Sequence, residues 1–189
     1  PLHGETLVAA LPDATLLCIP DGEAHKHMQT VTDLCRACAR AGLDRGSTIV
    51  GLGGGVVGDI AGYVAASYMR GVRFVQAPTS LLAMVDSSVG GKVGVDIPEG
   101  KNLVGAFKQP AAVLVDPDVL QTLPDAEWRN GMAEVIKHGF IRDLSLLDPS
   151  LHTLDQAEAL IRRAVQVKVE VVQQDPYEQN IRQYLNLGH

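Results

Sequence analysis

A glycine-rich segment between an expected strand and an expected helix constrains the fold of this chain most. Residues 47–62 read STIVGLGGGVVGDIAG. The apolar run 48–52 predicts a strand, and the spacing G-x-G-x-x-G follows it at Gly53, Gly55 and Gly58. The helix that we expect next has one face formed by Ile60, Tyr63, Val64 and Ser67. Glycines in this setting let the backbone approach a phosphate at a helix N-terminus, so the segment predicts an α/β domain that binds a phosphorylated ligand.

One feature departs from the ordinary dinucleotide fingerprint. That fingerprint carries an Asp or Glu about twenty residues after the glycines, where its carboxylate holds the ribose. The sequence has no acidic residue near Arg73, which occupies that place. The motif alone therefore leaves three readings open: a dinucleotide site, a sugar-phosphate site and a plain glycine-rich turn.

Short β-branched runs alternate with helical spacing through the first two thirds of the chain, which is typical of a parallel sheet covered by helices. We expect strands at Thr15–Ile19, Thr48–Leu52, Val72–Gln76 and Ala112–Val115. A helix is expected over His27–Ala41, with Gly42 ending it. Its apolar face is formed by Val31, Leu34, Cys35 and Cys38. With the first two strands this helix would form a βαβ unit of a Rossmann-like sheet.

The strand signals stop after Asp116. Helices are expected over Asp125–Phe140 and Asp155–Gln174. Asp155 with Glu158 fits a capping box for the second helix, and Pro176 would stop it. We therefore expect a domain boundary near Pro117, with an α/β domain over residues 1–116 and the start of an α-helical domain over residues 117–189.

Composition narrows the class of partner. The 189 residues are 46% apolar and 20% charged, so the chain can bury hydrophobic cores and is not expected to be disordered. Its formal net charge is -6 and it has no stripe of Lys and Arg, which argues against nucleic acid as a partner. No apolar run approaches the roughly 20 residues that span a bilayer, and no signal-peptide pattern is present. We expect a cytoplasmic protein with no membrane partner.

Three cysteines cannot pair evenly. Cys35 and Cys38 lie one turn apart inside the expected helix, away from its start, where a thiolate would be stabilised. We interpret them as reduced, structural thiols of a protein in a reducing compartment. The chain opens at Pro1 without a Met and closes at His189 directly after an apolar stretch, and we expect it to be incomplete at both ends.

The glycine-rich segment is the beginning of a longer pattern. From Gly53 to Gly105 the chain reads GGGVVGDIAGYVAASYMRGVRFVQAPTSLLAMVDSSVGGKVGVDIPEGKNLVG. LPDAEWRNGMAEVIKHG, KVEVV and LNLGH follow in that order. This series closely resembles the 3-dehydroquinate synthases over essentially the whole chain. The resemblance implies an NAD-dependent cyclase that uses Zn2+, with Co2+ possible, and that forms a homodimer.

The resemblance also implies which residues bind NAD. The implied cofactor-binding residues are Asp21, Gly22, Glu23, Lys26, Gly54, Gly55, Val56, Val57, Gly58, Asp59, Thr79, Ser80, Leu82, Lys92, Lys101 and Thr122. Residues 54–59 would lie at the pyrophosphate, residues 79–82 beside the nicotinamide, and Thr122 near the adenosine. Without the resemblance, Thr79 and Ser80 would be interpreted as a turn after a strand.

A second implied set would contact the substrate, a small phosphorylated sugar acid. These residues are Asp86, Lys92, Asn102, Lys137, Lys168, Arg182 and Asn186, with Arg70 reaching the site of a neighbouring subunit. Such a substrate needs several fixed cations, which the lysines and Arg182 supply. For any single lysine the alternative is a solvated surface charge. Gly90 and Gly91 indicate a tight bend before Lys92, whereas Lys168 lies among valines and could snorkel from an apolar face.

The family holds its metal with one Glu and two His, which leaves positions open for substrate oxygens. Glu134 in GMAEVIKHG matches the carboxylate ligand and His189 in LNLGH matches the first histidine. The second histidine would lie beyond His189. The alternative within the chain is His138, because a Glu-x-x-x-His pair can share a metal on one helix face. The histidines without an acidic partner at ligand spacing, which we expect at the surface, are His3, His25, His27 and His152.

The implied reaction converts 3-deoxy-D-arabino-heptulosonate 7-phosphate to 3-dehydroquinate and phosphate in the shikimate pathway. Three alternatives stay open: a related sugar phosphate cyclase such as 2-deoxy-scyllo-inosose synthase, a metal-dependent polyol dehydrogenase, and a nucleotide-binding fragment without turnover. Arg182 and Asn186 favour a carboxylated substrate. Residues 142–161 look shorter than the helical hairpin of relatives, which leaves the placement of Lys168 relative to Glu134 open.

Overall fold

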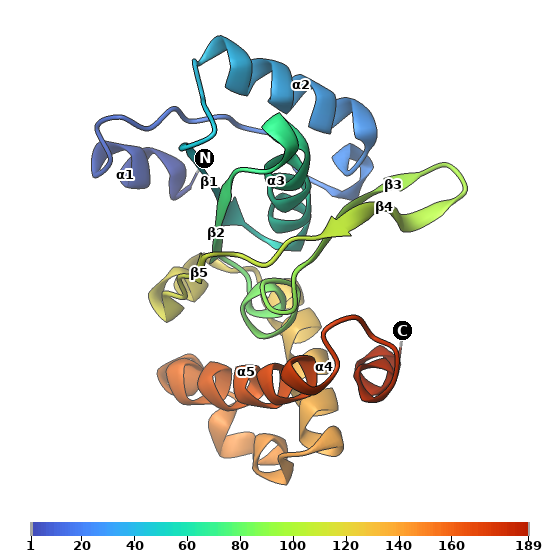
Figure 1. The fold of residues 1–189 in the computed structure, drawn as a ribbon. Helices are drawn as coiled ribbons and strands as arrows, with labels where there is room; N and C mark the ends of the chain where they lie inside the picture. Colours follow the sequence, from blue (N-terminus) through green and yellow to red (C-terminus); the bar gives the residue numbers. More distant parts are fainter. Residues whose placement is uncertain (1, 189) are drawn as a thin grey trace. The chain divides into compact units, whose positions relative to one another are not determined.

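A computed structural model describes residues 2–188 of the chain (Figure 1). The helices are α1 (Gly4–Ala9), α2 (Met28–Arg40), α3 (Gly55–Ser67), α4 (Asp125–Ile141) and α5 (Ala157–Gln174). The strands are β1 (Thr48–Gly53), β2 (Arg73–Pro78), β3 (Lys92–Ile97), β4 (Gly100–Phe107) and β5 (Ala112–Val113). Short 3-10 turns lie at Glu23–His25, Tyr68–Arg70, Pro117–Thr122, Leu144–Leu147, Pro149–Leu151, Leu154–Gln156 and Ile181–Asn186. A π-helical turn covers Ala83–Ser87.

The chain divides into two compact units, each of which is discontinuous in sequence. The first unit holds the residues up to Ala77 together with Gly91–Ala112, and the second holds Pro78–Gly90 together with the residues from Val113 on. The expected division at residues 116 and 117 treats 78–90 as part of the first domain, whereas these residues pack within the second unit. The reason is that the Ala83–Ser87 turn packs against α4 and α5.

The first unit combines a sheet with two helices. Its strands are ordered β1-β2-β5, and β3 pairs with β4 as an antiparallel hairpin with an irregularity between Val95 and Ile97. Helix α3 packs against β1 and β3, and α2 packs against α3. The core of this unit is formed by Val31, Cys38, Ile60, Val64, Ala65, Tyr68, Val72, Phe74, Val93 and Val95. A close approach of helix and hairpin is possible because Gly62 has no side chain: a Cβ there would lie 2.3 Å from Val93 Cγ1.

The second unit is helical. Helix α5 is buried along one face and packs against α4 and the Ala83–Ser87 turn. Its core is formed by Leu81, Met84, Val85, Leu120, Met132, Val135, Leu146, Ala157, Leu160, Ile161, Ala164 and Val167. Because the turn, α4 and α5 share this core, the polar side chains that follow on these three segments are held in fixed positions relative to one another.

Most of the expected elements are confirmed. Strands β1, β2 and the short β5 form where strands were predicted, and α2 and α4 match their predicted ranges within about two residues. The predicted α/β class with a Rossmann-like sheet, followed by helices, is also confirmed. The three cysteines are free in the structure, and their role as reduced thiols stays a prediction.

Three expectations are wrong or incomplete. Thr15–Ile19 is not a strand but runs as coil, with Leu16 and Leu17 exposed, so the expected first βαβ unit does not form among the described residues. The capping box is wrong because a 3-10 turn at Leu154–Gln156 delays the start of α5, whose N-cap is Gln156 without a side-chain hydrogen bond. The β3–β4 hairpin, which Figure 1 shows extending away from the β1-β2-β5 sheet, was not predicted.

In the part of the chain that the structure describes, none of the helices combines the length and the apolar character that crossing a membrane requires.

Candidate active site

The start of α3 has the features of an anion-binding helix N-terminus. Its N-cap is Gly54, which offers no side-chain hydrogen bond to the first turn, and the first turn contains no acidic residue. The amides of that turn and the helix dipole therefore favour a negatively charged group. Gly58 serves helix packing, because a Cβ there would lie 2.7 Å from Gln76 Oε1 on β2. The glycine-rich segment thus joins a strand to a helix as the sequence predicts, with Val56 and Val57 in the first turn of the helix, and phosphate binding there stays a prediction.

A buried lysine, Lys26, contacts two other predicted NAD and substrate residues in the first unit. Lys26 is 5% exposed, and its Nζ lies 2.7 Å from Asp59 Oδ2 on α3. The same Nζ donates a hydrogen bond to Asn102 Oδ1 at 2.6 Å. Lys101 forms a more exposed ion pair with Glu23 at 3.3 Å. Residues that are distant in sequence therefore converge, as expected of a ligand site.

A pocket of about 390 Å³ lies beside this lysine. It is lined by Glu23, Ala24, Lys26, His27, Asp96, Ile97 and Pro98. Asp21 and Gly22 directly precede this wall, and Gly22 has a φ of 100°, which favours glycine. The pocket combines charged groups with an apolar side, and its contact with a nucleotide stays a prediction.

Two further predicted residues of the first unit, Lys92 and Arg70, are exposed. Lys92 is exposed at the first position of β3, after the bend predicted at Gly90 and Gly91, which have φ values of 104° and 69°. Arg70 is exposed and has a φ of 68°. Nothing in the structure tests its expected role at a neighbouring subunit, which stays a prediction.

Four predicted NAD residues belong to the second unit. Thr79, Ser80 and Leu82 precede the Ala83–Ser87 turn, and Ser80 Oγ accepts a hydrogen bond from the Ala83 amide at 3.3 Å. Thr122 ends a 3-10 turn, and its hydroxyl donates to the Val119 carbonyl at 2.9 Å. Their contact with a cofactor stays a prediction.

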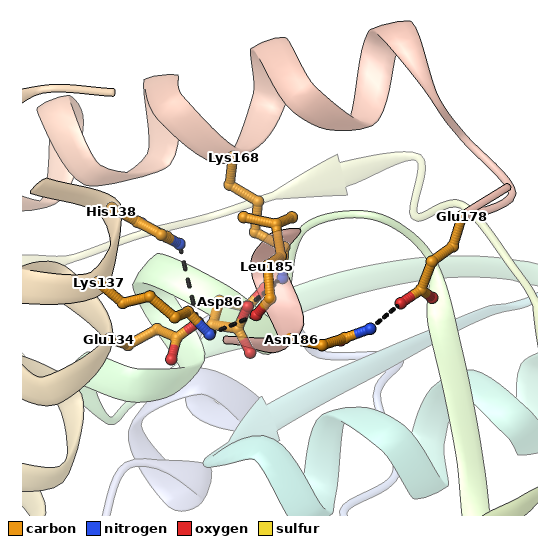
Figure 2. Close-up of polar contacts among 8 residues, drawn as sticks. All are labelled: Asp86, Glu134, Lys137, His138, Lys168, Glu178, Leu185 and Asn186. Atoms are coloured by element: carbon orange, nitrogen blue, oxygen red, sulfur yellow. Dashed lines mark hydrogen bonds and ion pairs between the residues drawn. The ribbon is translucent and has the colours of Figure 1, made fainter. Parts of the chain in front are cut away.

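The second unit gathers five ionisable side chains from three segments (Figure 2). They are Asp86 from the Ala83–Ser87 turn, Glu134, Lys137 and His138 from α4, and Lys168 from α5. Lys168 is ion-paired with the Asp86 carboxylate and donates to the Asp86 carbonyl at 2.6 Å. Lys137 Nζ lies 2.6 Å from Glu134 Oε1 and donates to the Leu185 carbonyl at 2.5 Å. We call these five side chains the buried charge cluster.

The charge state of the cluster follows from its contacts. Burial alone would raise the pKa of Asp86, but the neighbouring cationic groups, Lys168 foremost, together outweigh it and the pKa of Asp86 is lowered. Burial lowers the pKa of His138 to about 4, while the Asp86 carboxylate and the Ala164 backbone oppose this less strongly. Asp86 is therefore a carboxylate and His138 a neutral imidazole at neutral pH, which is the form in which each can bind a metal.

Three members of the cluster have the donor atoms of a metal site. One ligand atom from each of Asp86, Glu134 and His138 can be chosen so that all three lie within 4.8 Å of one another. His138 Nε2 lies 3.8 Å from Glu134 Oε1. Carboxylate oxygens with an imidazole nitrogen are a common ligand set for Zn2+ and Co2+. Among the described residues no other group of three such side chains meets the same distance condition.

Arg182 and Asn186, expected to bind substrate, are engaged within the protein. Arg182 is 3% exposed, and its guanidinium donates to the Gly90 carbonyl at 2.9 Å and to the Pro176 carbonyl at 2.5 Å. Asn186 Nδ2 donates to Glu178 Oε1 at 2.6 Å. In this structure the Arg182 guanidinium therefore holds the backbone at Gly90 and Pro176 in place, and its role toward a substrate stays a prediction. His189, the second expected metal ligand, lies outside the described residues.

The sequence reasoning found four of the five members of the cluster through the family resemblance and treated the fifth, His138, as an alternative only. The four-residue spacing of Glu134 and His138 indicated that the two side chains lie on one helix face. What the spacing could not show is that Asp86, on a different segment, completes the group.

Comparison with known proteins gives a consistent result. A family model described as 3-dehydroquinate synthase N-terminal matches residues 16–130, and one described as 3-dehydroquinate synthase C-terminal matches residues 131–189. The chain is 48% identical over 206 aligned residues to a 3-dehydroquinate synthase of Symbiobacterium thermophilum, covering 100% of this chain and 56% of that protein. The chain thus spans little more than half the length of this relative.

Two solved structures are similar throughout the chain. One is a 2-epi-5-epi-valiolone synthase from Streptomyces hygroscopicus with NAD+ and Zn2+ bound, with a TM-score of 0.91 and 34% identity, covering 100% of this chain and 56% of that one. The other is a 2-deoxy-scyllo-inosose synthase complexed with carbaglucose-6-phosphate, NAD+ and Co2+, with a TM-score of 0.89 and 28% identity, covering 100% of this chain and 55% of that one.

Proposed function

Because the chain belongs to the 3-dehydroquinate synthase family, we propose that it is the NAD-binding and metal-binding part of a 3-dehydroquinate synthase. The proposed reaction converts 3-deoxy-D-arabino-heptulosonate 7-phosphate to 3-dehydroquinate and phosphate. The observation that carries the proposal is the buried charge cluster, in which two lysines and two carboxylates of the family pattern meet a histidine. A proposed homodimer rests on the resemblance alone.

The residues present fit both cofactors. The open N-terminus of α3 and the pocket beside Lys26 suit the pyrophosphate and one end of NAD. Asp86, Glu134 and His138 offer the donor set of a divalent transition metal. When bound, NAD supplies a reversible hydride acceptor and Zn2+ or Co2+ supplies a Lewis acid for the hydroxyl group that is oxidised.

The protein side chains would orient and neutralise the substrate. Among the described residues, the Lys168 ammonium donates two hydrogen bonds, both to Asp86, so one N–H is left for a substrate oxygen. Asp86, ionised at neutral pH, can accept a hydrogen bond from a substrate hydroxyl group. Because these groups are largely buried, their charges act in a medium of low dielectric constant and stabilise developing charge more than surface groups would.

The choice between cyclases rests on sequence similarity more than on Arg182. A guanidinium that donates to two backbone carbonyls has fewer donors left for a substrate carboxylate. The relative named as a 3-dehydroquinate synthase is 48% identical to the chain, whereas the valiolone and inosose synthases are 34% and 28% identical.

The three free cysteines support the proposed reducing, cytoplasmic location.

The deciding experiment measures phosphate and NADH together. The chain is given 3-deoxy-D-arabino-heptulosonate 7-phosphate with catalytic NAD and Zn2+, and we expect phosphate release without accumulation of NADH. Lys168→Met should abolish most of the release. Arg162→Met is the matched control, because Arg162 lies on the same helix and pairs with Glu158 in solvent.

Each other outcome points to a different function. Accumulation of NADH would identify a polyol dehydrogenase, and preferential phosphate release from glucose 6-phosphate would identify a cyclase of the inosose type. NAD binding without any phosphate release would leave a nucleotide-binding protein and overturn the proposed reaction for this chain.

A further inference from the structure

We propose that Asp96 is a positioning residue, which holds a bulge in β4 so that Lys101 and Asn102 face the pocket beside Lys26. The proposal names a residue that neither the glycine motif nor the family resemblance implied. It rests on the proposed function for the identity of the ligand, NAD. All of these residues belong to the first unit.

The pairing of the β3–β4 hairpin shows where the bulge lies (Figure 1). The pairs on either side of it are Val95 with Val104 and Ile97 with Gly100. A single residue of β3, Asp96, therefore faces residues 101–103 of β4. Extra residues in one strand bend that strand and re-aim its side chains, and such bulges are common beside active sites. Lys101 and Asn102 both lie on this bulge.

The Asp96 side chain and backbone hold the bulge from two sides. Asp96 Oδ1 accepts a hydrogen bond from the Asn102 amide at 2.7 Å. Asn102 has a φ of 55°, and a residue other than glycine keeps this left-handed conformation only where its surroundings fix it. The Asp96 amide donates to the Lys26 carbonyl at 2.8 Å. One residue thus links the backbone of the bulge to the backbone of the buried lysine.

The bulge explains how two adjacent side chains reach one pocket. Neighbouring side chains of a regular strand point to opposite faces. Asn102 Oδ1 nevertheless accepts a hydrogen bond from Lys26 Nζ at 2.6 Å, and Lys101 Nζ lies 3.3 Å from Glu23 Oε1. Glu23, Lys26 and Asp96 line the same pocket. Loss of the bulge would therefore turn Lys101 or Asn102 away from it.

The test measures the affinity of the chain for NAD by isothermal titration calorimetry. Asp96→Glu should weaken NAD binding about tenfold, because its longer side chain moves the carboxylate away from the Asn102 amide and uncouples partners in one network. Asp96→Asn should stay within about twofold of the unaltered chain, because its Oδ1 can accept the same hydrogen bond. Glu99→Ala is the control, since Glu99 is an exposed acidic residue of the same hairpin.

A direct contact between Asp96 and NAD is the competing explanation, because Asp96 itself lines the pocket. A double-mutant cycle with Lys101→Ala separates the two. If Asp96 acts through the bulge, Asp96→Glu should weaken NAD binding by a smaller factor in the Lys101→Ala chain, where one positioned side chain is already absent. The same factor in both backgrounds would overturn the proposal.

The other outcomes also decide. Unchanged affinity in Asp96→Glu, or an equal loss in Asp96→Asn and Asp96→Glu, would overturn the proposal and leave NAD as the cofactor of the proposed function. If Asp96→Glu fails to fold by circular dichroism, Asp96→Ala replaces it with the same expected loss, because it removes the acceptor. A chain that shows these effects on NAD but releases no phosphate would keep this proposal and lose the proposed reaction. An unaltered chain that binds no NAD would overturn both.

Discussion

At the scale of single residues, Lys168 shows how a charged side chain is kept inside a protein. Its side chain is 8% exposed and its ammonium meets both the carboxylate and the carbonyl of Asp86. A buried ammonium is costly unless it is paired and hydrogen-bonded. The pair therefore constrains the position of α5 relative to the Ala83–Ser87 turn, since either group without the other would be an uncompensated charge.

We predict that breaking this pair from one side is strongly destabilising. Lys168→Met and Asp86→Asn should each lower the free energy of unfolding by about 3 kcal/mol, a value at the low end for buried pairs because Asp86 is one quarter exposed. The double variant should lose less than the sum of the two. Urea unfolding measures all three, and strictly additive losses would contradict a direct pair.

The control for this cycle is the exposed pair of Arg162 and Glu158 on the same helix. Their side chains are 77% and 75% exposed at a distance of 2.9 Å. Arg162→Met should change the free energy of unfolding by less than about 1 kcal/mol, because exposed pairs contribute little.

Sequence reasoning reached these residues only in part. It identified Lys168 as a candidate cation but left a snorkelling surface lysine open, because its neighbours Val167 and Val169 fit both readings. The burial of Lys168 and its contact with Asp86 exclude a surface lysine, and Asp86 is 82 residues away in sequence. Spacing along one helix can suggest Glu134 with His138, but it cannot place a carboxylate from another segment beside them.

At the scale of elements, close packing rather than propensity explains why α3 contains glycines. Gly58 and Gly62 lie on the face that meets β2 and the β3–β4 hairpin, where a Cβ would collide with Gln76 and Val93. The sequence showed the glycines as a phosphate-binding pattern. It did not show the hairpin, because the residues that follow Gly91 include glycines at positions 94, 100 and 105 that weaken the strand signal.

We predict that Gly62→Ala destabilises the first unit. The new Cβ would lie 2.3 Å from Val93 Cγ1 and 2.9 Å from Phe74 Cε1, so the helix must move or the core must rearrange. Overpacking of this kind costs about 1–3 kcal/mol of unfolding free energy, measured by urea denaturation. Gly46→Ala is the control, because the nearest atom to its new Cβ would be 3.4 Å away. Equal stability of the two variants would show that the core adapts without cost.

The segment after α5 is organised by one carboxylate. Asp175 is 6% exposed and accepts hydrogen bonds from the amides of Gln179, Asn180 and Arg182 at 2.9, 2.6 and 3.1 Å. Burial would raise the pKa of Asp175, but these amides outweigh it and the pKa is lowered. The carboxylate thus holds the turn that positions the Arg182 guanidinium beneath Gly90.

We predict that Asp175→Asn lowers the melting temperature by several degrees at pH 7. A carboxyl group whose pKa is lowered by folding adds stability above its ordinary pKa of about 3.9, and that stability is lost as the pH falls through the lower folded value. The difference between the variant and the unaltered chain should therefore be constant from pH 7 to about pH 5 and shrink below about pH 4. Circular dichroism melts measure it, and a difference that grows on acidification would contradict this role.

At the scale of the whole molecule, two hydrophobic cores correspond to the two compact units. The sequence predicted the change from strands to helices after Asp116, because that change is a change of hydrophobic period. It could not predict that residues 78–90 belong with the helices. Leu81, Met84 and Val85 look like part of an α/β pattern until α4 and α5 are seen to cover them. Discontinuous units of this kind depend on contacts between segments that are distant in sequence.

The last prediction concerns where a bound metal stabilises the molecule. Asp86, Glu134 and His138 all belong to the second unit, so binding there stabilises the fold of that unit by mass action. With free Zn2+ at one hundred times its dissociation constant, the gain is about 2.7 kcal/mol, which slows exchange of amides that open only by unfolding about a hundredfold. Hydrogen exchange with and without Zn2+ should therefore show the strongest slowing in the buried parts of α4 and α5.

Glu134→Gln is the control for this experiment, because it removes one donor from the site and should remove most of the protection. Slowing that is confined to α2 and α3 of the first unit would place the metal elsewhere and contradict the site. Slowing in the second unit that survives Glu134→Gln would also contradict it, because Zn2+ would then bind that unit without this carboxylate. Protection that is strongest in the second unit and depends on Glu134 is the pattern that a metal bound at Glu134 requires.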